Sequence, residues 1–145
     1  MGYIIRISSL TIDSMNKLMT PIIFCVNKKK VLSITKGYNI LSINEVLAKK
    51  LINYEQKKRK LFVIEEINNI VDSVGEPLLI TDFEILFNPE FQINVLKLFI
   101  NASRRKKILI LWPGMYDNGK LKFAEVGYKD YFSYNIEDYD ISCII

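Results

Sequence analysis

A short apolar run that ends in acidic residues limits what this chain can fold into more than any other feature. Residues 78–80 are Leu-Leu-Ile, and Thr81, Asp82, Phe83 and Glu84 follow them. Consecutive apolar residues predict a strand buried on both faces, as in the middle of a parallel sheet. Open α/β sheets bind their ligands at the carboxyl ends of such strands. The run therefore predicts an α/β sheet with carboxylates at its ligand-binding edge.

Asp82 and Glu84 allow two interpretations. In nucleotide-hydrolysing α/β proteins, an acid in this place helps to hold Mg²⁺. That would make Asp82 a candidate Mg²⁺ ligand and both residues candidate catalytic groups. Acidic residues after a strand also commonly cap or solvate the loop that leads into the next helix. The sequence leaves both interpretations open.

Other apolar runs and helical periodicities predict the remaining elements. Strands are expected at 22–26, 38–43, 108–112 and 141–145, with a strand or an extended arm at 3–7. Helices are expected at 12–19, 45–58, 62–74 and 88–103. Their predicted end signals are the N-caps Thr11 and Asn44, a start at Asn88-Pro89-Glu90, and the C-cap Gly75. The tight-turn sequence Asp117-Asn118-Gly119 predicts a hairpin.

This order of elements predicts one α/β domain over residues 1–145, with a largely parallel central sheet. Residues 1–20 are expected to form an arm and a short helix, 21–112 the core, and 113–145 a hairpin and a final strand. Only 12 residues, 27–38, separate the first two core strands, so a helix between them has two to three turns at most. The order resembles the core of P-loop NTPases, which implies a three-layer domain.

In such a domain the phosphate-binding loop follows the first core strand. Here that position holds Asn27, Lys28, Lys29 and Lys30, and no glycine occurs between Gly2 and Gly37. Because a phosphate loop depends on glycines that let backbone N–H groups wrap the phosphates, a conventional cradle is not expected. Two interpretations remain: the lysines hold an anion at a helix start, as the candidate nucleotide-binding residues, or they form a solvated turn in place of a lost loop.

Composition excludes several classes of function. The chain has no histidine, which removes His-type zinc sites, Ser-His-Asp and Cys-His catalysis, and histidine acid–base chemistry. Cys25 and Cys143 lie in apolar runs and are expected to be reduced core residues. No apolar run approaches the roughly 18 residues of a membrane span, and no signal peptide is apparent. A cytoplasmic protein without membrane contact is expected.

The net charge of +4 is unevenly distributed, which suggests surfaces for complementary partners. Residues 1–60 carry 12 basic and 3 acidic groups, and residues 61–96 carry 7 acidic groups and no basic ones. The basic blocks at 28–30, 57–60 and 104–107 are candidates for DNA contact. In the last block, Arg104 and Arg105 are candidate arginine fingers that reach across a subunit boundary, or else a solvated helix end.

Several stretches resemble BrxF, the small P-loop-containing protein family of type III BREX antiphage defence systems. They are residues 37–44, Gly-Tyr-Asn-Ile-Leu-Ser-Ile-Asn; 80–89, Ile-Thr-Asp-Phe-Glu-Ile-Leu-Phe-Asn-Pro; 111–114, Leu-Trp-Pro-Gly; 119–121, Gly-Lys-Leu; and 124–128, Ala-Glu-Val-Gly-Tyr. The resemblance implies an accessory protein that works beside larger DNA-modifying and ATPase partners. The chain departs from the family in its phosphate loop, and the family's acid aligns with either Thr81 or Asp82.

Three functions follow as hypotheses. The first is a degenerate P-loop-like subunit that acts by binding larger proteins of the defence system, without a cofactor and without enzymatic activity. The second is an ATPase with ATP and Mg²⁺ in an unusual phosphate site, or in one completed by a neighbouring subunit. The third is a subunit that contacts DNA.

Overall fold

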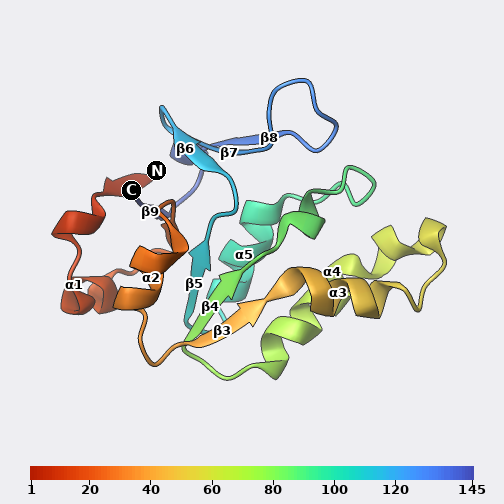
Figure 1. The fold of residues 1–145 in the computed structure, drawn as a ribbon, viewed down its shortest axis with the longest axis horizontal. Helices are drawn as coiled ribbons and strands as arrows, with labels where there is room; N and C mark the ends of the chain where they lie inside the picture. The colour runs from red at the N-terminus through yellow and green to blue at the C-terminus, as the bar shows by residue number, and fades with distance from the viewer.

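A computed structural model describes all 145 residues, and it has a six-stranded parallel sheet at its centre (Figure 1). The strands lie in the order β1 (Tyr3–Ile5), β9 (Ser142–Ile144), β2 (Ile22–Phe24), β5 (Ile108–Leu111), β4 (Leu78–Thr81) and β3 (Asn39–Ser42). Every neighbouring pair is parallel. The predicted α/β class and largely parallel sheet are therefore confirmed.

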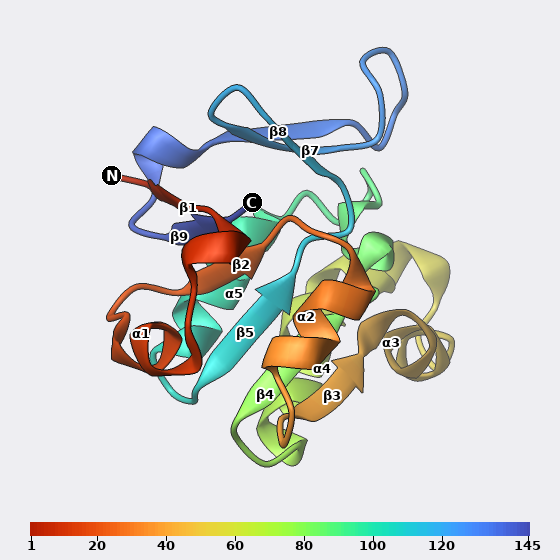
Figure 2. The same ribbon diagram turned by 60° about the vertical axis from the view of Figure 1, so that its left-hand side comes forward.

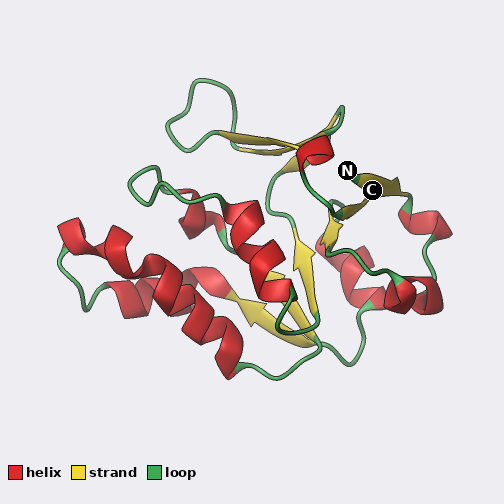
Figure 3. Ribbon diagram, turned by 180° about the vertical axis from the view of Figure 1, so that it is seen from behind, coloured by secondary structure: helices red, strands yellow, loops and turns green.

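Helices cover both faces of this sheet, so the domain has three layers. One face carries α3 (Ile43–Leu51), α4 (Arg59–Ser73) and α5 (Val95–Ser103) over a cluster of 28 buried residues (Figure 3). The opposite face carries the shorter α1 (Ile12–Lys17) and α2 (Lys28–Ile34) over a cluster of 8 buried residues (Figure 2). The architecture is compatible with a P-loop-like domain. None of the helices is both long and apolar enough to cross a lipid bilayer.

Because all six strands are parallel, their carboxyl ends lie at one edge of the sheet. Phe24 pairs with Leu111, and Ser42 pairs with Thr81. Strand β5 lies between β2 and β4 and pairs with both. The loop after β2 and the acids after β4 therefore come from strands that are not adjacent, yet they open onto the same edge.

The predicted hairpin is present and belongs to a second, antiparallel sheet. Strands β6 (Met115–Asp117) and β7 (Lys120–Phe123) are joined by Asn118 and Gly119, with φ of 49° and 81°. Positive φ at both residues is what a tight hairpin turn needs. A third strand that the sequence did not predict, β8 (Phe132–Asn135), pairs with β7. The Trp112 Nε1–H donates to the Lys122 carbonyl (2.9 Å) and ties this sheet to the main one.

The helix predicted at 45–58 is wrong at both of its ends. It begins at Ile43, with Ser42 in the N-cap position in place of Asn44, and ends at Leu51. A 3₁₀ turn, Gln56–Lys58, then leads into α4. The Arg59 Nε–H donates to the carbonyls of Leu51 and Tyr54, so this arginine stabilises the end of α3 and holds the connection to α4. The basic run at 57–60 joins two helices and does not complete one.

The predicted start at Asn88-Pro89-Glu90 is also wrong. Asn88 Oδ1 accepts from the Glu90 N–H and closes a turn, and Gln92 has a positive φ of 52°, which a helix does not allow. Helix α5 begins at Val95, where Asn94 Oδ1 accepts from the Lys97 N–H. The Thr11 cap is confirmed, with a capping box to Ser14.

The predicted C-cap Gly75 is not in the left-handed conformation of a glycine cap, because α4 ends at Ser73 and continues through an extended Val74. The carbonyls at the end of α4 are instead satisfied by the ammonium group of Lys106, which comes from outside the helix. It donates to the carbonyls of Val71, Asp72 and Val74. A cation at this helix end also interacts favourably with the helix dipole.

Candidate functional site

The carboxyl edge of the sheet carries a polar cluster centred on Asp82. Its Oδ2 accepts hydrogen bonds from Ser42 Oγ (2.8 Å) and Thr81 Oγ1 (3.0 Å), and Lys28 Nζ lies 3.9 Å away. The bond from Ser42, assisted by Thr81 and Lys28, holds the pKa of Asp82 below its ordinary value of 3.8, against an opposing effect of desolvation. Asp82 is therefore a carboxylate at neutral pH, and one of its oxygens is already surrounded by donors.

Asp82 also has an unusual backbone. Its φ of 50° lies in the left-handed region, which aspartate tolerates better than most residues with a side chain. This turn ends β4 at Thr81, which is fully buried. Thr81 and Asp82 thus occupy different environments: Thr81 is the last strand residue, and Asp82 lies beyond it with a half-exposed side chain.

A second pair of polar residues extends the cluster. The Asn44 amide donates to Glu84 Oε2 (2.9 Å), and its Oδ1 accepts from the Ile85 N–H (2.9 Å). The backbone N–H of Asn44 donates to the Asp82 carbonyl (2.7 Å). Asn44, predicted as a helix cap, instead fastens the start of α3 to the turn after β4. Its role and that of Ser42 were missed, since both partners lie 40 residues away in sequence.

The chain has no extended loop in the phosphate-binding position. Only Cys25 and Val26 separate β2 from Asn27, whose Oδ1 accepts from the Lys30 N–H (2.9 Å) and caps α2. Of the four candidate nucleotide-binding residues at 27–30, Lys28 alone approaches the acids. Helix α2 is 7 residues long, just under two turns, which agrees with the predicted upper limit of two to three turns.

The residues present match only part of what a magnesium–nucleotide site needs. Mg²⁺ is commonly held by one or two carboxylates together with substrate phosphates and water, and Asp82 with its hydroxyl neighbours meets that minimum. No group of three or more His, Cys, Asp or Glu side chains is arranged to hold a metal by itself. The glycine-lined backbone that would hold the phosphates has no counterpart at residues 25–30.

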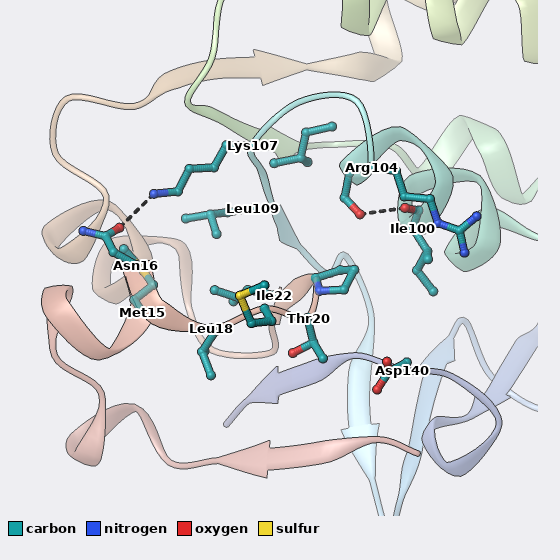
Figure 4. A pocket seen from close by; sticks show the side chains of 14 residues that line it. Met15, Asn16, Leu18, Thr20, Ile22, Ile100, Arg104, Lys107, Leu109 and Asp140 are labelled. Carbon is teal, nitrogen blue, oxygen red and sulfur yellow. Dashed lines mark hydrogen bonds between the residues drawn. The ribbon is translucent and has the colours of Figure 1, made fainter.

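The candidate arginine fingers lie at the opposite edge of the sheet from Asp82. Arg104 lines a cavity of about 360 Å³ at the amino ends of β2 and β5, with Ile22, Ile108 and Asp140 (Figure 4). Arg105 pairs with Asp72 (3.3 Å) within the same chain. Within one molecule, neither arginine belongs to the cluster around Asp82, so a finger role would require a second subunit.

Both cysteines are free thiols that belong to the sheet. Cys143 is buried in β9 and Cys25 is partly buried just after β2. A hydrogen bond to the Cys143 thiol, together with burial, raises the pKa of Cys25. At neutral pH this thiol is therefore protonated and a poor nucleophile.

No protein family, curated protein or solved structure matches this chain.

Proposed function

We propose that this protein is an accessory subunit of a bacterial antiphage defence system of the BREX type, and that it acts by binding a larger protein component. In this proposal its P-loop-like domain has a degenerate phosphate site and serves as a scaffold. The defence role depends on the resemblance of residues 37–44, 80–89 and 111–114 to BrxF.

One observation carries the non-enzymatic part of the proposal. The oxygen of Asp82 that faces the cluster accepts from Ser42 and Thr81 and lies 3.9 Å from Lys28, all within one chain. In an active NTPase such groups are directed at Mg²⁺ and phosphate. Here they are directed at one another, and the chain between β2 and α2 is too short to surround a triphosphate.

A second candidate function, nucleotide binding with ATP and Mg²⁺, is supported by the approach of Lys28 to Asp82. A lysine after the first core strand and an acid after a later strand are the two side chains that converge on nucleotide in a P-loop enzyme. A neighbouring subunit would then supply the missing phosphate contacts, with Arg104 as a candidate for that role.

Thermal melting with ATP and Mg²⁺ separates the two candidates, because a ligand that binds only the native state raises the melting temperature. The proposal expects no shift for the natural protein. The test compares it with an Asp82→Ala, Glu84→Ala variant and with a matched control, Glu125→Ala, Asp138→Ala, that removes two exposed acids elsewhere. A nucleotide-dependent shift that persists in the control and vanishes in the Asp82, Glu84 variant would establish a nucleotide site instead.

The protein-binding part needs its own measurement. The chain, expressed with the remaining genes of a defence system, is expected to co-purify with one larger component in stoichiometric amount. Purification of the chain alone from such cells would overturn this part of the proposal.

A further inference from the structure

All of the net positive charge of this protein lies in its first 38 residues. They contain six basic residues and one acid, a net charge of +5, whereas residues 39–145 contain 14 basic and 15 acidic residues, a net charge of −1. The two parts together give the +4 of the whole chain. These first residues form β1, α1, β2 and α2. With β2 buried in the sheet, the charge is carried by α1, α2 and the loops next to them, and these two helices lie over one face of the sheet (Figure 2).

The six cations of this layer are exposed and mostly unpaired. They are Arg6, Lys17, Lys28, Lys29, Lys30 and Lys36, here called the α1–α2 cationic face. Only Lys28 forms an ion pair, with Asp82. The single acid of the layer, Asp13, pairs with none of them. Their charge is therefore available to an external partner.

Part of each of the other two basic blocks makes contacts within the fold. In the block at 104–107, Arg105 pairs with Asp72, Lys106 binds the end of α4, and Lys107 donates to Asn16. In the block at 57–60, Arg59 binds the end of α3. Lys57 and Lys60 line a cavity together with Glu55 and Glu90, so this surface mixes both signs of charge. The α1–α2 cationic face differs from these blocks in its surroundings, because the first 38 residues contain six cations and only one acid.

We propose that the α1–α2 cationic face binds the phosphate backbone of duplex DNA without reading its sequence. Five of its six cations are lysines, a residue depleted in protein–protein interfaces and suited to phosphate as a point charge. The aromatic side chains of this part of the chain offer only one exposed ring for stacking on bases: Tyr38 is half-buried beneath Lys107, Phe24 is buried in β2, and Tyr3 on the edge strand β1 is exposed. Stacking on single strands needs such platforms, whereas contact with a duplex backbone does not.

The test measures fluorescence anisotropy of a labelled duplex of about 20 base pairs over a series of salt concentrations. The natural protein is expected to bind with an affinity that falls steeply as salt rises. A Lys29→Ala, Lys30→Ala, Lys36→Ala variant is expected to lose about tenfold or more in affinity, and to reduce the slope of log K against log salt by about 2 to 3. The matched control, Lys57→Ala, Lys58→Ala, Lys60→Ala, removes the same charge and is expected to stay within about twofold of the natural protein.

A second variant, Arg6→Gln, Lys17→Gln, tests the α1 side of the face and guards against misfolding of the first. It is expected to weaken binding by an intermediate amount. Absence of salt-dependent DNA binding, or equal losses in the two triple variants, would overturn the proposal. Equal binding to vesicles rich in phosphatidylserine would do so too, since it would show attraction to any anionic surface. None of these results depends on whether the chain also binds a larger protein.

Discussion

Ser42 Oγ donates a 2.8 Å hydrogen bond to Asp82 Oδ2 and joins the carboxyl ends of two neighbouring strands, β3 and β4. The residue that precedes Asp82, Thr81, is the register partner of Ser42. One hydroxyl therefore fixes both the position of the carboxylate and its protonation, at the edge where α/β sheets bind ligands. A variant without the Ser42 hydroxyl therefore tests how much this hydrogen bond contributes to the pKa of Asp82 and to stability.

The variant Ser42→Ala is expected to raise the pKa of Asp82 toward its ordinary value, because it removes the largest cause of the depression. The free energy of unfolding should fall by about 0.5–1 kcal/mol, less than is usual for a charged hydrogen bond because the carboxylate is half exposed. NMR titration of the Asp82 carboxyl and urea unfolding measure the two quantities. Ser33→Ala, which removes only a bond within α2 to the Lys30 carbonyl, should leave the Asp82 titration unchanged.

Asp82 should also give stability a particular dependence on pH. Its folded pKa lies below its ordinary value of 3.8, so the unfolded chain takes up the proton more readily. The stabilisation is fully present well above 3.8 and is lost as pH falls through the lower, folded pKa. Asp82→Asn lacks this contribution and keeps a residue that tolerates positive φ. The difference in unfolding free energy between the two proteins should be constant near neutral pH and shrink in acid; a constant difference down to low pH would contradict this.

The variant Asn44→Ala should destabilise the turn after β4. Asn44 satisfies the Ile85 N–H and binds Glu84, and loss of both bonds leaves a partly buried donor without a partner. The expected loss is about 1–3 kcal/mol in urea unfolding. Asn53→Ala, at an exposed asparagine beyond the end of α3, is the control and should change stability by less than about 0.5 kcal/mol.

Much of the fold was predictable because its strands are short, apolar and buried. The apolar runs at 22–26, 78–82 and 108–112 correspond to β2, β4 and β5. The Asn118-Gly119 pair forms the tight turn that the sequence predicted for the hairpin. Residues 124–135 carry no such pattern. Strand β8 there is stabilised by tertiary contacts, with Tyr134 opposite Leu121 and its hydroxyl accepting from the Val95 N–H. Pairing of this kind leaves little trace in local sequence.

The candidate site was predictable only in part. Position at the end of a buried strand identified Asp82 and Glu84, but their partners come from a distant part of the chain: Ser42 ends the neighbouring strand β3, and Asn44 lies at the start of α3. Finding them requires the knowledge that β3 and β4 are neighbours. The helix starts predicted at Asn44 and Asn88 were wrong for a related reason. An asparagine side chain can form hydrogen bonds within a turn or to a distant residue as readily as it caps a helix.

The aromatic contacts of Phe87 should hold the small sheet to the main one. Phe87 is fully buried and stacks on Phe123 at 4.2 Å between ring centroids, with Trp112 at 5.6 Å. Phe87→Ala should reduce the unfolding free energy by about 3–5 kcal/mol. Because Trp112 is the only tryptophan, its emission should move to longer wavelength as water enters. Tyr128→Ala, at an exposed ring, should change neither quantity; unchanged emission in Phe87→Ala would mean that the sheets are held together by other contacts.

Strand β9 sits between β1 and β2 and pairs with both. The first strand of the chain thus has no partner until residues 142–144 arrive, and the central pairings of β2 with β5 also join segments more than 80 residues apart. Contacts of such long range slow folding. The pairing of β1 with β9 therefore cannot form until residues 142–144 have been synthesised, so β1 is expected to join the sheet late in folding.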